Sequence, residues 1–186
     1  LLADELGKEL VIENMDFDAV CLSVSQQKCD IAMAGLTINE EREEYVTFTD
    51  SYYSASQRLI VPSNVTTFDD CKTADDVAAK LAETKSSDQI GVQQGTTGDI
   101  YSTDDFGDDN VERFNKGMEA VQALQQGKID AVIIDNQPAK TFVEENEGLK
   151  ILETSYVEED YALAIKKGND DLVKNCLLYT SPSPRD

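Results

Sequence analysis

The chain has 186 residues, with 37 acidic and 16 basic side chains, no His and a formal net charge of -21. This length allows one domain or two small lobes, and so negative a chain is not expected to bind nucleic acid or an anionic lipid surface. Without His, the chain has no Ser-His or Cys-His nucleophile pair, no His-ligated zinc and no imidazole proton shuttle, which excludes most familiar hydrolase mechanisms.

The hydrophobic pattern predicts alternating helices and strands. In the first third of the chain we expect a strand at residues 9–15, a helix at 18–27, a strand at 30–34, a helix from Asn39 and an extended segment at 54–61. Beyond the turn at 62–64 we expect a helix at 73–85 opened by a capping box, a strand at 89–93, an acidic loop around 104–110, a strand at 111–114, a helix at 116–126, a strand at 129–135, a helix at 137–146 and strands at 149–153 and 161–166. This order is typical of parallel α/β sheets, whose sites lie at the carboxyl ends of strands.

One helix-turn-strand unit occurs twice, at residues 26–35 and 125–135. Aligning Lys28 with Lys128 places Gly35 and Asp135 at equivalent strand ends. Two lobes that face one cleft would explain the repeat, and the alternative is that both segments use a common α/β turn.

The segment from Gly35 through Leu36 and Thr37 to Arg42 combines a strand-end glycine, a hydroxyl, free backbone N–H groups and an arginine in a first helical turn. Backbone N–H groups favour an anion, and a guanidinium can bind both oxygens of a carboxylate. The segment is therefore a candidate carboxylate clamp. The alternative is a capped helix with a solvated Arg42.

A second polar loop, residues 95–98, follows the strand that ends at Gln93, and the hydroxyls and amides of Thr96 and Thr97 could hold part of a ligand. The loop lacks the lysine of a phosphate-binding loop and the G-x-G-x-x-G spacing of dinucleotide sites, so we expect no cofactor.

Asp135 closes the apolar strand at 129–135, where a carboxylate is costly unless it is paired or reaches an open cleft. It could bind an ammonium group, or it could cap the following helix. Phe17 also follows a strand and either points toward a cleft or belongs to the core. The acidic residues at 104–109 do not have calcium-loop spacing, so we expect a solvated loop and no metal site.

Five ordered segments make the chain resemble the type II solute-binding proteins of amino-acid ABC importers, family 3. They are Met15-Asp16-Phe17-Asp18, residues 30–37 with Glu41-Arg42, Phe48-Thr49-Asp50-Ser51-Tyr52-Tyr53, residues 91–98 and residues 129–135. The resemblance implies an α/β, two-lobed periplasmic-binding-protein-like fold with two hinge crossings. Lobe 1 would comprise residues 1–59 and 165–175, and lobe 2 residues 60–164.

The resemblance also implies site roles. Arg42 would hold the ligand carboxylate with Thr37 and the Thr96 and Thr97 amides. Gly35 and Asp135 would hold the ammonium. Phe17 would stack on the ligand and Gln93 would approach its side chain, which gives the expected ligand-binding set Phe17, Gly35, Leu36, Thr37, Arg42, Gln93, Thr96, Thr97 and Asp135.

Compared with the family pattern, we expect the first strand of lobe 1 to be missing, and residues 176–186, with two prolines, to be a non-native tail. The resemblance implies no catalysis, a monomer outside the cytoplasm, an amino-acid ligand and an ABC permease as partner, with membrane association only through a lost anchor. Two alternatives are a dehydratase-like enzyme of the same fold, with Asp135 as the acid, and the sensor domain of a receptor.

Overall fold

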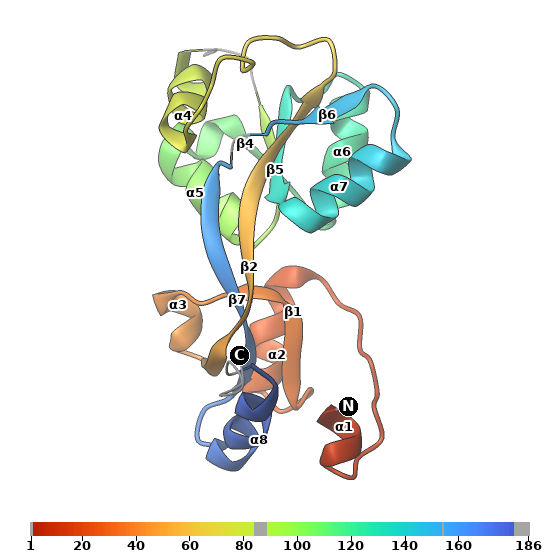
Figure 1. The fold of residues 1–186 in the computed structure, drawn as a ribbon, viewed down its shortest axis with the longest axis vertical. Coiled ribbons are helices and arrows are strands. Elements are labelled where there is room, and N and C mark those ends of the chain that lie inside the picture. Colours follow the sequence, from red (N-terminus) through yellow and green to blue (C-terminus); the bar gives the residue numbers. More distant parts are fainter. Residues whose placement is uncertain (1, 84–88, 154, 181–186) are drawn as a thin grey trace, which may run out of the picture. The chain divides into compact units, whose positions relative to one another are not determined.

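The computed structural model describes residues 2–83, 89–153 and 155–180. The chain divides into two compact units (Figure 1). Unit 1 comprises Leu1–Ser54 and Asp160–Asp186, and unit 2 comprises Ala55–Glu159. The chain passes from one unit to the other along two strands, β2 (Val46–Pro62) and β7 (Val157–Lys166). The lobe boundaries at residues 59 and 164 stay a prediction.

The strands form one mixed sheet in the order β1-β7-β2-β5-β3-β4, with β6 (Leu149–Ile151) also paired to β2. In unit 2, β3 (Ile90–Gln93) pairs in parallel with β4 (Val111–Phe114) and β5 (Ala131–Asp135), whereas β2 is antiparallel to β5 and β6. The expectation of α/β architecture is therefore confirmed, but the sheet is mixed rather than parallel.

Alternation along the unit 2 strands produces a core on each face of the sheet. Leu59 and Ile133 belong to one buried cluster, which Val77 of α4 (Ala74–Glu83) joins and against which Tyr101 and Phe106 of α5 (Thr97–Phe106) pack. Ile60 belongs to the other cluster, with buried residues of α6 (Gly117–Gln125) and α7 (Asn136–Glu145). The two helix pairs thus cover opposite faces (Figure 1).

Unit 1 also has two buried clusters around β1 (Ile31–Thr37) and β7, which are antiparallel. Val24 of α2 (Val20–Ser25) packs with Leu36 and Ala164 in the first cluster. In the second, Cys176 of α8 (Asp170–Thr180) packs with Leu163 and Ile165, and Leu2 of α1 (Leu2–Glu5) lies against them. Two further short helices are η1 (Phe17–Ala19), which precedes α2 in sequence, and α3 (Glu40–Glu43), which follows β1.

Two expected elements are wrong. Residues 9–15 form no strand, and Leu10, Val11 and Ile12 are 70%, 70% and 81% exposed. A strand needs a hydrogen-bonded neighbour, and none of the described strands pairs with this segment. The acidic stretch is not an open loop either, because α5 continues to Phe106 and η2 (Asp108–Asn110) follows.

The expected capping box of α4 is confirmed. The Thr73 hydroxyl accepts from the Asp76 N–H at 3.1 Å, and the Asp76 carboxylate accepts from the Thr73 N–H at 3.0 Å. The expected last residues of this helix, 84 and 85, lie outside the described residues.

The repeated helix-turn-strand unit has the same turn geometry in both copies. Gln27 and Gly127 both have positive φ, 60° and 66°, and follow the C-cap residues Gln26 and Gln126. The next residue donates back to the helix in each copy, from Lys28 N to Ser23 O at 2.9 Å and from Lys128 N to Ala123 O at 3.0 Å. The two turns are therefore equivalent in structure as well as in sequence.

The last helix differs from expectation, because α8 continues past residue 175 to Thr180. Cys176 has no exposed surface, so the core of unit 1 includes the first residue of the expected tail. The two prolines that prompted the tail boundary, at 182 and 184, lie outside the described residues. Among the residues that the structure describes, no helix is long and apolar enough to span a bilayer.

Candidate functional site

The Arg42 side chain in unit 1 is buried and held from two sides. Asn39 caps α3 by accepting from the Arg42 N–H at 2.8 Å. The guanidinium Nη1 donates to the Thr37 carbonyl at 2.7 Å, and its carbon lies 5.4 Å from the centroid of the Phe17 ring, within cation–π range. Arg42 is only 8% exposed, so the alternative of a solvated arginine is wrong.

The glycine of the predicted clamp lies against an aromatic pair. Gly35 has a φ of 62°, and a Cβ there would lie 3.2 Å from the Tyr161 ring. Tyr161 stacks on Tyr53 with 5.7 Å between ring centroids. Leu36 has no exposed surface and packs in the core, so only its backbone remains for a ligand contact. These aromatic residues were not predicted as site residues.

Burial also affects a thiol beside this group. Desolvation raises the pKa of the Cys21 thiol, and the positive charge of Arg42 opposes that shift. Phe17 is half-buried and packs against the same core cluster as Cys21. The structure therefore brings Phe17, Thr37 and Arg42 together in unit 1.

In unit 2, Asp135 occupies the N-cap position of α7 but its side chain makes no capping hydrogen bond. Its Oδ1 instead accepts from the Nε2 of Gln57, the residue directly opposite on β2. The helix-cap alternative is thus not what the structure shows. The carboxylate is oriented by a cross-strand amide at the end of β5.

The second polar loop begins α5. The Thr96 hydroxyl accepts from the Asp99 N–H at 3.3 Å as the helix N-cap and donates to the Gln93 carbonyl at 2.8 Å. The Thr97 hydroxyl donates to the Glu159 carboxylate at 3.0 Å. The Gln93 side chain donates to the Asn115 carbonyl at 3.3 Å. Thr97 and Asp135 thus belong to one polar cluster with Gln57 and Glu159, whereas Thr96 and Gln93 contact each other.

Sequence reasoning missed the two central members of that cluster, Gln57 and Glu159, which are 1% and 9% exposed. Gln57 Nε2 donates to Glu159 Oε1 at 2.5 Å as well as to Asp135. The available signal was a glutamine inside a strand whose later residues, Leu59, Ile60 and Val61, are all apolar. A buried polar side chain in such a strand needs a partner.

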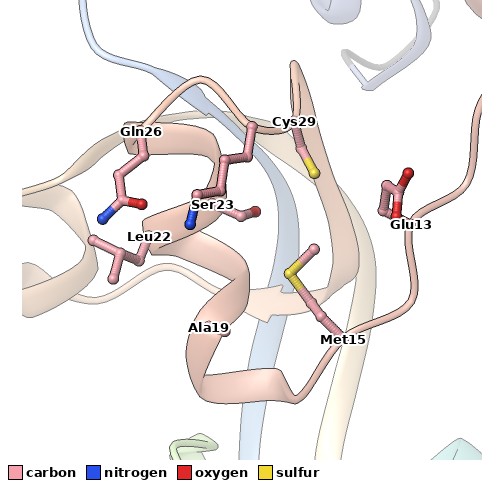
Figure 2. Close-up of a pocket in the computed structure, with 8 residues that line it drawn as sticks. Glu13, Met15, Ala19, Leu22, Ser23, Gln26 and Cys29 are labelled. Carbon is pink, nitrogen blue, oxygen red and sulfur yellow. The ribbon is translucent and has the colours of Figure 1, made fainter.

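A pocket of about 330 Å³ opens in unit 1 (Figure 2). Figure 2 shows Met15 and Cys29 on its walls beside α2, with Glu13 on the preceding segment. None of the predicted ligand-binding residues lines it, so it is not the candidate site.

Two carboxylates of the acidic stretch contact other side chains of unit 2. Asp105 accepts from the Tyr156 hydroxyl, and Asp108 pairs with Arg113 at 2.8 Å. Within the described residues, no group of three or more His, Cys, Asp or Glu side chains is arranged to hold a metal ion. Both carboxylates are nevertheless exposed, so these contacts do not contradict the expected solvation of the acidic residues.

The chain as a whole matches a known family. Residues 1–175 match the model of the bacterial extracellular solute-binding proteins, family 3. The chain belongs to this family. Family 3 members are extracellular solute-binding proteins, a class of binding proteins rather than enzymes.

Relatives named for different amino acids match the chain. The L-cystine-binding protein TcyJ of Escherichia coli is 27% identical over 175 residues, which cover 93% of this chain and 62% of TcyJ. The histidine-binding periplasmic protein of Salmonella typhimurium is 30% identical over 145 residues, or 74% of this chain and 51% of the relative. The chain therefore spans less than two thirds of the length of these relatives.

Solved structures of amino-acid-binding proteins share the fold. The arginine-bound form of truncated ArgBP from T. maritima has a TM-score of 0.82 and 34% identity, and the match covers 96% of this chain and 79% of that one. The substrate-binding protein AbpA from Streptococcus pneumoniae, bound to L-arginine, has a TM-score of 0.83 and 28% identity over 96% of this chain and 72% of that one. The fold is therefore that of the two-lobed amino-acid-binding proteins.

Proposed function

We propose that the protein captures an amino acid outside the cytoplasm and delivers it to the permease of an ABC importer, without chemically changing the ligand. The observation that carries this proposal is the state of Asp135. It sits at a helix N-cap position but makes no capping bond, and a cross-strand amide holds its carboxylate instead. A carboxylate oriented in this way suits a ligand ammonium group.

The opposite pole of the ligand would bind in unit 1. Arg42 is buried, and its guanidinium is oriented by the Thr37 carbonyl and the Phe17 ring. We propose that it binds the ligand carboxylate, helped by the backbone of Leu36 and Thr37 and by the amides of Thr96 and Thr97. Gly35 would contribute its carbonyl to the ammonium, Phe17 would stack on the ligand, and Gln93 would approach the ligand side chain.

In this proposal the ligand is bound by charge at both ends, its ammonium group by Asp135 and its carboxylate by Arg42. The relatives named for cystine, histidine and arginine support an amino acid as the ligand class. They also make these three the first ligands to test. The proposed state is a monomer that carries no cofactor.

A thermal-shift screen of the common L-amino acids and L-cystine tests the proposal on the 186-residue chain. A ligand that binds only the folded state stabilises it by about 2.7 kcal/mol at a hundredfold excess over Kd. We expect one or a few amino acids to raise the melting temperature in proportion to the logarithm of concentration. A flat screen up to millimolar concentrations would contradict amino-acid binding.

A further inference from the structure

We propose that Gln57 is the positioning residue for the Asp135 carboxylate and that Glu159 and Thr97 hold Gln57 in place. This inference rests on the proposed function, because it concerns how the same site recognises the ammonium group of its ligand. It assigns roles to Gln57 and Glu159, neither of which belongs to the predicted ligand-binding set.

The hydrogen bonds form a short chain in unit 2. Gln57 Nε2 donates to Asp135 Oδ1 and, at 2.5 Å, to Glu159 Oε1. A primary amide nitrogen has two hydrogens, so these two acceptors use both of them. Thr97 Oγ1 lies 3.4 Å from Nε2, and this hydroxyl donates its own hydrogen to Glu159 Oε1 at 3.0 Å. Each carboxylate therefore receives one hydrogen from the same amide.

The amide has little freedom to leave this position. Gln57 is 1% exposed, and its register partner on β5 is Asp135, so the two side chains share one face of the sheet. On the other side of the amide, a Cβ on Gly98 would lie 2.8 Å from Gln57 Oε1. The first turn of α5 therefore packs directly on the Gln57 side chain and needs glycine there.

The charge of the cluster gives the amide its importance. Asp135 and Glu159 are two carboxylates that contact the same nitrogen, and Glu159 is 9% exposed. Within the described residues, Glu159 Oε2 and Gln57 Oε1 are buried without a hydrogen-bond partner. Since like charges repel strongly where water is excluded, the amide hydrogens are needed to hold both carboxylates in this arrangement.

The consequence is specific to one end of the ligand. Without the amide, Asp135 loses the contact that orients its Oδ1, while Arg42 in unit 1 keeps its own contacts. Binding of an ammonium group should weaken more than binding of a carboxylate group. If Gln57 only supported the fold, its loss would weaken binding of the ammonium group and of the carboxylate group to the same extent.

The test measures calorimetric affinities of the 186-residue chain for L-arginine and L-histidine, each paired with the same acid lacking its α-amino group. The readout is the affinity for the amino acid divided by the affinity for its analogue without the α-amino group. Wild type is compared with Gln57→Leu, which is close in size but has no N–H, with Asp135→Asn, and with the double variant. Gln122→Leu, which removes an exposed glutamine of α6, is the matched control.

We expect Gln57→Leu to lower the ratio about tenfold, the loss of one charge-assisted hydrogen bond. The double variant should lower it no further than Asp135→Asn alone, because both changes remove one interaction. Gly98→Ala, which displaces the amide instead of removing it, should lower the ratio in the same direction. Gln122→Leu should leave it unchanged.

The outcomes separate this inference from the proposed function. A wild type that binds none of the screened amino acids overturns both, and a different amino acid identified by the screen replaces L-arginine and L-histidine in the paired test. If wild type binds and Asp135→Asn lowers the ratio, but Gln57→Leu keeps the wild-type ratio or adds fully to Asp135→Asn, the positioning role is wrong and amino-acid binding stands. If Gln57→Leu is unfolded at the assay temperature, Gln57→Asn takes its place. Its amide is on a shorter side chain, so it should also lower the ratio.

Discussion

The guanidinium carbon of Arg42 lies 5.4 Å from the centroid of the Phe17 ring, and the same guanidinium donates to the carbonyl of Thr37. Both contacts come from residues of unit 1. A guanidinium that is already fixed loses little further entropy when it binds a carboxylate.

Replacing Arg42 with Ala should weaken amino-acid binding by about 2–5 kcal/mol, because a desolvated carboxylate loses its bidentate partner. Arg42→Lys should recover only part of that loss, since an ammonium cannot bind both oxygens in the same plane. Isothermal titration calorimetry measures both. Lys150→Ala is the control, because it removes one positive charge from an ion pair with Asp69 in unit 2. An affinity for Arg42→Ala within about threefold of wild type would exclude the clamp role.

Gln27 should be a site where glycine stabilises the protein. Its φ of 60° is unfavourable for a side chain, whereas the equivalent Gly127 has a φ of 66° at no such cost. We expect Gln27→Gly to raise the free energy of unfolding by roughly 1 kcal/mol and Gly127→Ala to lower it by a similar amount. Urea denaturation measures both changes. Gln26→Gly, with a φ of -82°, should destabilise and serves as the control.

Removing residues 176–186 should destabilise unit 1. Cys176 has no exposed surface and packs with Leu163 and Ile165, so truncation leaves these side chains uncovered. Burial also raises the pKa of the Cys176 thiol, which lowers its thiolate fraction at neutral pH. Alkylation followed by mass spectrometry should therefore modify this residue only upon unfolding. Fast labelling in the folded protein would show that α8 does not pack as described.

Tyr156 should make the protein sensitive to alkaline pH. Burial raises the pKa of its phenol, and the hydrogen bond to Asp105 raises that pKa further. The phenol of the unfolded chain titrates near pH 10. Since the folded pKa is higher, the stabilisation is complete below about pH 10 and is lost as pH rises through the folded value. Urea unfolding between pH 8 and 11 should show a smaller decline for Tyr156→Phe than for wild type. Equal declines would contradict this linkage.

The sequence predicted the chain order of most elements and the residues at strand ends, because hydrophobic period and turn residues are local properties. Asp135 and Arg42 were selected as candidate site residues in this way. It did not predict Gln57 and Glu159, because their importance arises from cross-strand register and burial, which join residues far apart in the chain.

The dependence on contacts far apart in the chain also explains why the strand predicted at residues 9–15 is wrong. Its apolar residues are suited to a strand, but pairing depends on a neighbour that local pattern does not report. The closing helix shows the opposite error. Prolines at 182 and 184 predicted an early end, yet α8 continues to Thr180, because proline restricts the residues next to it rather than a helix several residues before it.

The division of the chain has a consequence for synthesis. Unit 2 is one uninterrupted stretch, Ala55–Glu159, whereas unit 1 needs residues from both ends of the chain. β1 can complete its pairing with β7 only after Ile165, the partner of Ile31, has been translated. During synthesis, unit 2 can therefore fold before β7 is available to pair with β1. Unit 1 can fold only after β7 and α8 have also left the ribosome.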